Sequence, residues 1–511
     1  MRFGAAPEPH KSMANIEHIV VLMLENRSFD HLFGFYPNVD GLKGNEYNLL
    51  NPWRPESAAN PRVFVGQNAA WNIVGNEGPS HSLKSVNKQL FAVSEPAAGQ
   101  VATNNGFVLS YHDGLFGSQI PNPTIDTLRE AMLAFTPARL PALNGLADQF
   151  VLCDRWFSDV PGPTQPNRLF THLATSNGFA YNVWDRLIDG DSIYNLVERA
   201  GNKWAVYYSD DNDAAKFVRL RAKAYTTAAE QAEWEQDQKN GALGGFFDFQ
   251  TFFSAHAADG TLAQYVFIEP AFGEDNQPES AINSMHAPHD VRPGDRLVAD
   301  VYGALRHNEQ LWAETMFILT FDEHGGFYDH VIPPAVDNPD GAVGQKSSRA
   351  PAFGFDRLGL RVPAIIASPW VAKGQIAHDE FRHTSIIATV REVFGLGGPL
   401  TRRDDSARTL SGLLTNSPRT DTPTTLPRLN QLEEAAALVN RKNVIDTPAS
   451  VPDELLAEKA AAWHRLMAKQ PASPWMPASV KEAQRTIRDS VKEFARARVA
   501  ADGFSSVPNK S

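Results

Sequence analysis

Short apolar runs recur along the chain, and segments with helical periodicity lie between them. A short apolar run is typical of a strand that is buried on both faces, as in a parallel sheet. The expected strands are Ile16–Leu24, Gln149–Leu152, Lys203–Tyr208, Tyr265–Ile268, Thr315–Phe321 and Val362–Ala367. The expected helices include Ile125–Leu143, Arg168–Thr175, Gly294–His307 and Phe381–Phe394. Strands that alternate with helices predict an α/β fold with a mostly parallel sheet and helices on both of its faces.

Three segments depart from this alternation. Residues 37–110 are rich in Asn, Gly, Pro and Ser, so we expect a long irregular insertion near the active site. Residues 333–359 are also loop-rich and are expected to line the same cleft. From about residue 431 the pattern changes to charged, amphipathic helices. We therefore expect an α/β domain over residues 14–430 and a helical C-terminal extension over residues 431–511.

The amphipathic stripes of the extension allow two interpretations. The favoured one is a helical tail that packs on its own core, and the alternative is a homo-oligomer formed through these helices. A similar choice arises at Gly245–Phe253, where Phe246, Phe249 and Phe253 share one helical face. We expect a core-facing helix there, with docking on lipid as the alternative.

Composition narrows the classes of function. The chain has 511 residues, 42% hydrophobic and 21% charged, as in ordinary soluble globular proteins. A net charge of −12 argues against sequence-independent binding of nucleic acid and against attraction to anionic membranes, whereas a zwitterionic headgroup remains compatible. The single cysteine, Cys153, excludes an intrachain disulfide and is expected to be a buried thiol at a strand end.

The sequence shows neither an export signal nor an apolar stretch long enough to span a membrane. We therefore expect a soluble protein, cytoplasmic from the sequence as given and secreted or periplasmic if an export signal has been removed.

Two acidic motifs carry the candidate chemistry, and each follows an apolar strand. Glu25 and Asn26 open the first motif, and Asp322 and Glu323 open the second. In an α/β sheet both would lie beyond the carboxyl ends of the strands, where three carboxylates repel one another unless a cation lies between them. Such oxygen ligands suit Ca²⁺, Mg²⁺ or Mn²⁺, and Zn²⁺ also accepts them. The alternative is a pair of polar strand ends that cap turns.

A hydroxyl near a predicted helix start is the candidate nucleophile. Thr164 precedes the helix, and Pro166 rigidifies the helix entrance. Free backbone N–H groups at a helix N-terminus favour a phosphate, and an activated hydroxyl there could attack it. The alternative is a threonine that makes only a capping hydrogen bond.

Four histidines are candidate acids or phosphate ligands. His81 lies in the insertion, and His383 lies at a helix start. His286 and His289 lie on a loop that feeds the same sheet edge as Asp322. An exposed loop histidine without a function is the ordinary alternative. A zinc site would need a third nearby ligand, which this segment lacks.

At these residues the chain resembles the bacterial phosphoesterase family that contains phosphatidylcholine-type phospholipases C and an acid phosphatase, together with the plant non-specific phospholipases C. The matching segments are Glu25–His31, Pro161–Arg168, Phe267–Pro270, His286–Val291, Asp322–Gly326 and Arg382–Ser385. The resemblance implies an alkaline-phosphatase-like core.

The resemblance also implies roles for particular residues. It implies one divalent metal ion, with a ligand set of Glu25, Asn26, Thr164, Asp322 and Glu323. Thr164 takes the nucleophile position. His81 and His286 match residues that contact the phosphoryl group or protonate the leaving oxygen, and His383 and His289 are candidates for substrate binding.

We therefore expect a metal-dependent phosphoric ester hydrolase. The preferred reading is a phospholipase C that cuts phosphocholine-type phosphodiesters on the glycerol side. Its nucleophile is Thr164, and its acid is His286 first and His81 second. The expected substrate is a phospholipid or a small phosphate ester. The alternatives are a broad-specificity acid phosphatase, which cleaves phosphomonoesters, and a non-catalytic binder of phospho-ligands.

Overall fold

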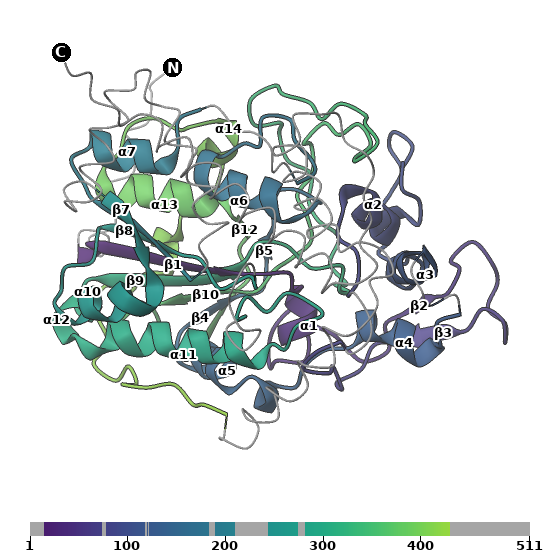
Figure 1. The fold of residues 1–511 in the computed structure, drawn as a ribbon, viewed down its shortest axis with the longest axis horizontal. Coiled ribbons are helices and arrows are strands. Elements are labelled where there is room, and N and C mark those ends of the chain that lie inside the picture. The colour runs from purple at the N-terminus through teal and green to yellow at the C-terminus, as the bar shows by residue number, and fades with distance from the viewer. Residues whose placement is uncertain are drawn as a thin grey trace, which may run out of the picture.

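An eight-stranded sheet forms the centre of the computed structural model (Figure 1), which describes residues 15–73, 78–117, 120, 122–182, 190–209, 244–273 and 282–429. The strand order is β11-β4-β10-β9-β1-β8-β6-β7. The strands are β1 His18–Leu24, β4 Val151–Cys153, β6 Trp204–Tyr208, β7 Gly244–Asp248, β8 Tyr265–Ile268, β9 Thr315–Phe321, β10 Ala364–Ala367 and β11 Gln375–Ala377. Among them β10 alone runs antiparallel to its neighbours, which confirms the expected mostly parallel sheet.

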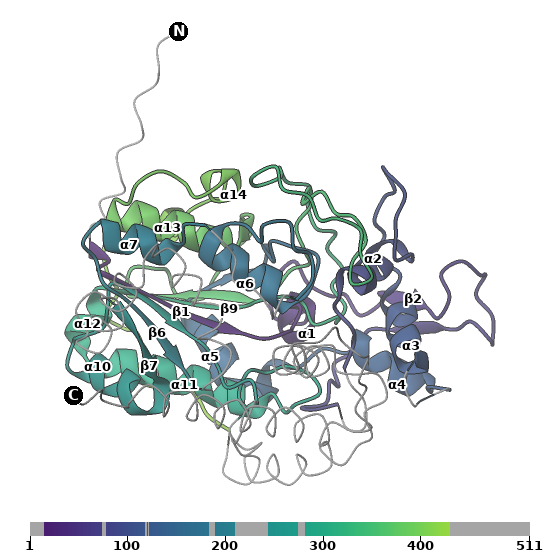
Figure 2. The ribbon, with the colours of Figure 1, turned by 45° about the horizontal axis from the view of Figure 1, so that its top comes forward.

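Helices cover both faces of the sheet, as expected (Figure 2). One face carries α5 Pro141–Gln149, α10 Ser254–Ala258, α11 Arg292–His307 and α12 Glu309–Ala313. The other carries α6 Thr164–Leu173, α7 Ile193–Arg199 and α13 Thr384–Phe394, with α14 Arg402–Asp405 beside them. None of the described helices is both long and apolar enough to cross a bilayer.

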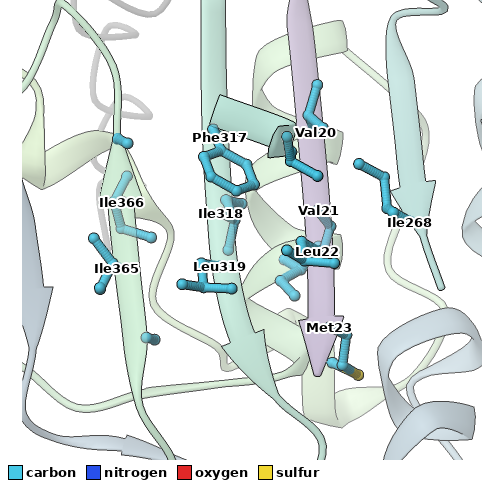
Figure 3. Close-up of a cluster of buried hydrophobic side chains, with 14 of the residues drawn as sticks. Val20, Val21, Leu22, Met23, Ile268, Phe317, Ile318, Leu319, Ile365 and Ile366 are labelled. Atoms are coloured by element: carbon cyan, nitrogen blue, oxygen red, sulfur yellow. The ribbon is translucent and has the colours of Figure 1, made fainter. Parts of the chain in front are cut away.

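The middle of the sheet forms the core because its central strand has a neighbour on each side. Val21 of β1 is paired with Phe267 of β8 and with Ile318 of β9, and all three are fully buried. Figure 3 shows Val21 and Ile318 in this layer, which continues through Ile366 of β10, the partner of Ile318. Strands that are buried on both faces need apolar residues at successive positions. The apolar runs in the sequence therefore predicted the positions of these strands.

A separate group of elements projects from one side of the sheet in both views (Figures 1 and 2). It contains β2 Tyr47–Leu49, β3 Arg62–Phe64, α2 Leu83–Phe91, α3 Phe107–Gly117 and α4 Ile125–Arg129. We call residues 47–132 the insertion lobe. It has a hydrophobic cluster of its own, which includes Val63, Leu90, Phe107 and Met132. The remaining short elements are α1 Phe29–Phe33, β5 Trp156–Phe157 and β12 Phe381–Arg382.

Two expected helices are wrong. The segment Ile125–Leu143 is divided among α4, two short 3-10 turns and the start of α5, because Pro137 and Pro141 lack the N–H that a continuous helix needs. The second is the core-facing helix expected over Gly245–Phe253. Phe246 lies in the strand β7, which pairs with β6, while Phe249 and Phe253 lie in the π-helical turn that follows and are buried.

Other expectations are confirmed or lie outside the described residues. Cys153 is buried at the end of β4, and burial raises the pKa of its thiol. The predicted helix Phe381–Phe394 starts later, because its first residues form β12. The C-terminal helices of residues 431–511 and the oligomer expected from them lie outside the described residues.

Candidate active site

The two acidic motifs meet at the carboxyl ends of β1 and β9, as predicted. The backbone N–H of Asn26 donates to Asp322 Oδ1 at 3.1 Å, and the N–H of Glu323 donates to the same oxygen at 2.7 Å. Together with Glu25, these four side chains are at most 1% exposed. The parallel pairing of β1 with β9 therefore brings together residues that lie almost 300 positions apart.

A tight backbone crossing fixes this corner. Asn26 adopts a left-handed conformation with φ of 61°, which is uncommon outside glycine. Gly325 lies against it, and a Cβ at Gly325 would approach the Asn26 carbonyl oxygen to 2.1 Å. The N–H of Gly325 donates to Glu323 Oε2 at 2.7 Å. Glycine is thus required at 325, both for its positive φ and for the close approach.

Two buried oxygens at this corner have no hydrogen-bond partner among the described residues: Asn26 Oδ1 and Glu323 Oε1. The Asn26 amide nitrogen donates to His81 Nε2 at 3.3 Å, which fixes the orientation of the amide. Buried oxygens without donors are costly unless a cation binds them. Amide and carboxylate oxygens are ligands for hard divalent cations, so the donor set fits such an ion.

The raised pKa of Glu323 also fits a site for a cation. Burial raises its pKa to about 8, and the negative charge of Asp322 adds to the shift, against the opposing effects of His81 and the Gly325 N–H. His81 Nε2 lies 3.8 Å from Glu323 Oε1. A buried carboxyl group with a raised pKa beside another carboxylate is typical of a site that a metal ion or a substrate completes.

Arg168 of α6 ties three strands together beneath this corner. Its Nε donates to Asp322 Oδ2 at 3.3 Å, and its Nη1 pairs with Glu269, the residue that follows β8. Its Nη2 donates to the carbonyl of Met23 in β1 at 3.2 Å. The guanidinium is fully buried. It partly neutralises the negative charge of Glu25, Asp322 and Glu323, which we call the acidic edge, and it orients Asp322.

Thr164 is the first residue of α6 and lies one helical turn before Arg168, on the same side of the helix. The loop before it is held by Asn167, whose amide contacts the carbonyls of Val160, Gly162 and Pro163 at 3.0–3.2 Å. Thr164 is 3% exposed. Because Arg168 contacts Asp322, the N-terminal turn of α6 lies near the acidic edge, and its backbone dipoles favour an anion there.

The structure brings two of the histidines together. The rings of His81 and His286 meet edge to face, 5.6 Å apart between their centroids. The loop that carries His286 is anchored because the N–H of Glu25 donates to the carbonyl of Ser284 at 2.8 Å. His289 lies on the same loop, where its backbone N–H donates to the His286 carbonyl at 2.9 Å.

His383 reaches the acidic edge from beneath. Its Nε2–H donates to the carbonyl of Asp322 at 2.6 Å, and its Nδ1 accepts from the indole N–H of Trp156 at 3.3 Å. Burial lowers its pKa, which keeps the ring neutral. Both ring nitrogens are used within the protein, so this geometry suits the positioning of Asp322, and a substrate contact for His383 stays a prediction.

The far halves of the two motifs form a second charged cluster. Asp30, Asp329 and His330 each offer one ligand atom within 4.8 Å of the others, a spacing that could hold a metal ion. Arg361 already contacts both carboxylates, each at 2.9 Å. The cluster is therefore built as a buried ion-pair network that joins the motifs.

Glu269, Arg168 and Arg361 were given no role by the sequence analysis. A signal for Glu269 was present, because it directly follows the apolar run Tyr265–Ile268 just as Glu25 and Asp322 follow theirs. Arg168 and Arg361 carry no such signal, since their partners come from other segments.

Comparisons with known proteins show the family of the chain. The family model described as "Phosphoesterase family" matches residues 16–397. Non-specific phospholipase C3 of Arabidopsis thaliana is 35% identical over 440 residues, 82% of this chain and 77% of the relative. Phospholipase C B of Mycobacterium tuberculosis is 27% identical over 427 residues, 78% of this chain and 76% of the relative.

Among solved structures, a protein in the alkaline phosphatase superfamily from Vibrio parahaemolyticus covers 60% of this chain and 79% of its own, with 12% identity and a TM-score of 0.30. A likeness of this degree says nothing about chemistry. The family match over most of the chain and the 35% identical relative show that the chain belongs to the phosphoesterase family and is a phosphoric ester hydrolase.

Proposed function

We propose that the chain is a metal-dependent phospholipase C that hydrolyses phosphocholine-type phosphodiesters through Thr164. One observation carries the proposal: Thr164 begins the helix whose next turn holds Asp322 through Arg168. A hydroxyl, a helix N-terminus and an acidic edge then surround one place where a phosphoryl group can bind. The names of the relatives, which are phospholipases C, support a phospholipid as the substrate, and the phosphocholine headgroup comes from the family resemblance.

The proposed reaction has two displacements. The Thr164 oxygen attacks phosphorus in line, and the bond from phosphorus to the glycerol oxygen breaks. His286, or His81 as the second candidate, gives a proton to the departing oxygen. Water then gives a proton back to the same histidine and attacks phosphorus, the bond from phosphorus to the Thr164 oxygen breaks, and the phosphorylated headgroup is released. Glu25, Asn26, Thr164, Asp322 and Glu323 would hold a divalent ion, whose positive charge would favour loss of the Thr164 proton to solvent and would stabilise the phosphoryl oxygens.

A diester suits the charges of this edge better than a monoester. The guanidinium at the edge, Arg168, is already engaged by Glu269 and Asp322. A phosphomonoester dianion needs cationic groups for its additional charge, whereas a diester carries a single negative charge. This favours the phosphodiesterase over the acid phosphatase.

The experiment is a comparison of p-nitrophenyl phosphorylcholine with p-nitrophenyl phosphate, each with and without chelator. We expect faster hydrolysis of the diester, loss of activity with chelator and recovery after a divalent metal is added. Preference for the monoester would replace this proposal with the acid phosphatase. Binding of phosphate without turnover of either ester would leave the non-catalytic binder.

Substitution of Thr164 tests the nucleophile. Thr164→Val keeps the shape and removes the hydroxyl, so we expect a loss of activity by several orders of magnitude, whereas Thr164→Ser should retain measurable activity because the hydroxyl survives. An acid quench of the wild type should trap a phosphorylated peptide containing residue 164. Near-normal turnover by Thr164→Val would reject the nucleophile.

A further inference from the structure

Exposed hydrophobic side chains are concentrated on the insertion lobe. Eight large hydrophobic residues are exposed among the described parts of the chain, and five of them belong to this lobe: Tyr47, Trp53, Phe64, Val101 and Ile125. The lobe projects beyond the end of the sheet where α1 lies (Figures 1 and 2). Scattered exposed hydrophobics are ordinary, but a concentration of them on one projecting unit indicates a binding surface.

The outer face of the β2–β3 hairpin carries a paired aromatic surface. Tyr47 and Phe64 are direct cross-strand partners, their ring centroids are 5.5 Å apart, and they are 39% and 40% exposed. The alternate residues Asn48 and Val63 point inward and are buried. The hairpin therefore presents its aromatic residues outward although its inner face already packs on the core of the lobe.

Trp53, in the loop between these strands, is held with most of its ring in solvent. It is 63% exposed, and its indole N–H donates to the carbonyl of Ala92 at 3.2 Å. Val101, 76% exposed, follows Gln100, whose amide donates to the carbonyl of Phe91 at 3.1 Å. Both exposed residues thus flank the C-terminal end of α2, with the polar group of the indole already satisfied.

The charges of the hairpin balance one another. Between residues 45 and 64 the chain has two acidic residues, Glu46 and Glu56, and two basic residues, Arg54 and Arg62. Arg62 pairs with Glu56 at 2.8 Å and lies over the Tyr47 ring at 4.5 Å. The whole chain has a net charge of −12, whereas this aromatic surface is locally neutral and offers both signs of charge. Such a surface complements a headgroup that carries a phosphate and a quaternary ammonium.

We propose that the outer face of the insertion lobe, formed by Tyr47, Trp53 and Phe64, docks the protein on a zwitterionic phospholipid surface. Tryptophan and tyrosine are the residues that proteins place at the boundary between water and lipid. The choice of lipid rests on the proposed function.

The position of the active site agrees with this docking. His81 lies just before α2, and the indole N–H of Trp53 donates a hydrogen bond to the carbonyl of Ala92, just after α2. The nine residues of α2 span about 14 Å. About the length of α2 therefore separates the docked end of the lobe from His81, which contacts Asn26 in the active site.

The test separates docking from catalysis. Partitioning onto phosphatidylcholine vesicles is measured by sedimentation in the Thr164→Val background, so that it needs no turnover. We expect Trp53→Ala to weaken partitioning by about five- to twenty-fold, with little dependence on salt. In the active enzyme the same substitution should slow hydrolysis of vesicle lipid and leave kcat/KM for p-nitrophenyl phosphorylcholine unchanged. Phe252→Ala, an aromatic residue 40% exposed outside the lobe, is the matched control.

Several outcomes would overturn the proposal. They are absence of wild-type partitioning, equal losses in the Trp53 and Phe252 variants, or a Trp53→Ala variant that partitions normally. A change from dimer to monomer in Trp53→Ala, with vesicle binding unchanged, would assign the surface to a second copy of the chain. Failure of the soluble diester assay in the wild type would refute the proposed activity without affecting the partitioning result.

Discussion

At the scale of single residues, the site depends on oxygens that the protein itself leaves without donors. Asp322 orients the corner by accepting from Asn26 and Glu323, and Asn26 Oδ1 and Glu323 Oε1 are buried there without a hydrogen-bond partner among the described residues. Removing the charge of Asp322 should therefore disturb the whole set.

Asp322→Asn should lose bound metal while the protein remains folded. The amide keeps the size of the side chain but loses the negative charge and one acceptor oxygen, so the ligand set is weakened. Elemental analysis after gel filtration should give close to one metal ion per wild-type chain and far less in the variant. Asp113→Asn, on an exposed carboxylate, is the control. Full metal content with normal turnover in Asp322→Asn would contradict the site.

His286→Ala should discriminate between leaving groups. A positioned acid contributes about 10²- to 10⁴-fold in rate, and that help matters for an alkoxide but little for p-nitrophenolate, which leaves unprotonated. The loss in kcat/KM should therefore be much larger for an alkyl phosphodiester than for p-nitrophenyl phosphorylcholine. His81→Ala, if His81 mainly binds phosphoryl oxygens, should slow both substrates to a similar degree. Equal losses for His286→Ala would reassign it to phosphate binding.

At the scale of elements, one helix is capped by another. The N-terminus of α5 has no capping side chain of its own, and Asp295 of α11 accepts from the N–H groups of Ala142 at 3.1 Å and Leu143 at 2.9 Å. Burial raises the pKa of Asp295 to about 7, against the effect of these two bonds. The carboxyl group thus joins two helices on one face of the sheet.

Asp295→Ala should lower the free energy of unfolding by about 1–3 kcal/mol, because two buried N–H groups lose their acceptor. Asp295→Asn keeps one acceptor oxygen and should cost less. Urea titration of both variants would measure this. A loss in Asp295→Asn as large as that in Asp295→Ala would show that charge, and not the capping bond, matters.

The sequence located elements better than it located contacts. The strands β1, β8 and β9 were predictable because strands buried on both faces are apolar at every position. The spacing of Phe246 and Phe249 fits a helix as well as a strand, and pairing with β6 decides for the strand. No local pattern distinguishes the two.

The same limit applies to the site. Glu25 and Asp322 could be predicted to meet, because both follow central strands. Arg168 could not be assigned to them, because its contact depends on how α6 packs across the sheet edge. Its neighbour Thr164 was identified by a local helix-start signal, which needs no knowledge of packing.

At the scale of the whole molecule, buried histidines set the response to pH. Burial lowers the pKa of His31, His172, His324 and His383, to about 3 for His172 and His324. These groups are neutral in the folded state and protonate on unfolding below pH ~6.5. Their contribution to stability is present above that pH and is lost as the pH falls.

His330 has the opposite sign. Burial alone would lower its pKa, but the hydrogen bond to Asp30 and the charges of Asp30 and Asp329 raise it to about 9. Its stabilising contribution is complete below its unfolded pKa of about 6.5 and is lost as the pH rises toward 9. The histidines by themselves therefore place the highest stability near neutral pH.

Unfolding temperatures measured from pH 4 to pH 10 test both the loss of stability expected as the pH falls, the acid limb, and the loss expected as the pH rises, the alkaline limb. Each buried histidine should steepen the acid limb by up to about 1.4 kcal/mol per pH unit. His330→Gln should flatten the alkaline limb and leave the acid limb unchanged. Buried carboxyl groups whose pKa is raised, namely Asp295, Glu323 and Asp329, also titrate in this range, so the difference between variant and wild type is the relevant quantity. A fold that gains stability below pH 5 would contradict this account.

The place of β1 in the sheet has a consequence for how the protein is made. The strand β1, the earliest of the described strands along the sequence, is a central one, and both of its neighbours, β8 and β9, come from residues 265–321. At the usual rates of translation, the roughly 240 residues between β1 and β8 take about 10 to 50 seconds to appear. Throughout that interval the apolar run His18–Leu24 has neither of its partners in the sheet. We therefore expect the nascent chain to bind chaperones that recognise short apolar segments, and the proposed metal site cannot assemble until synthesis has passed Glu323.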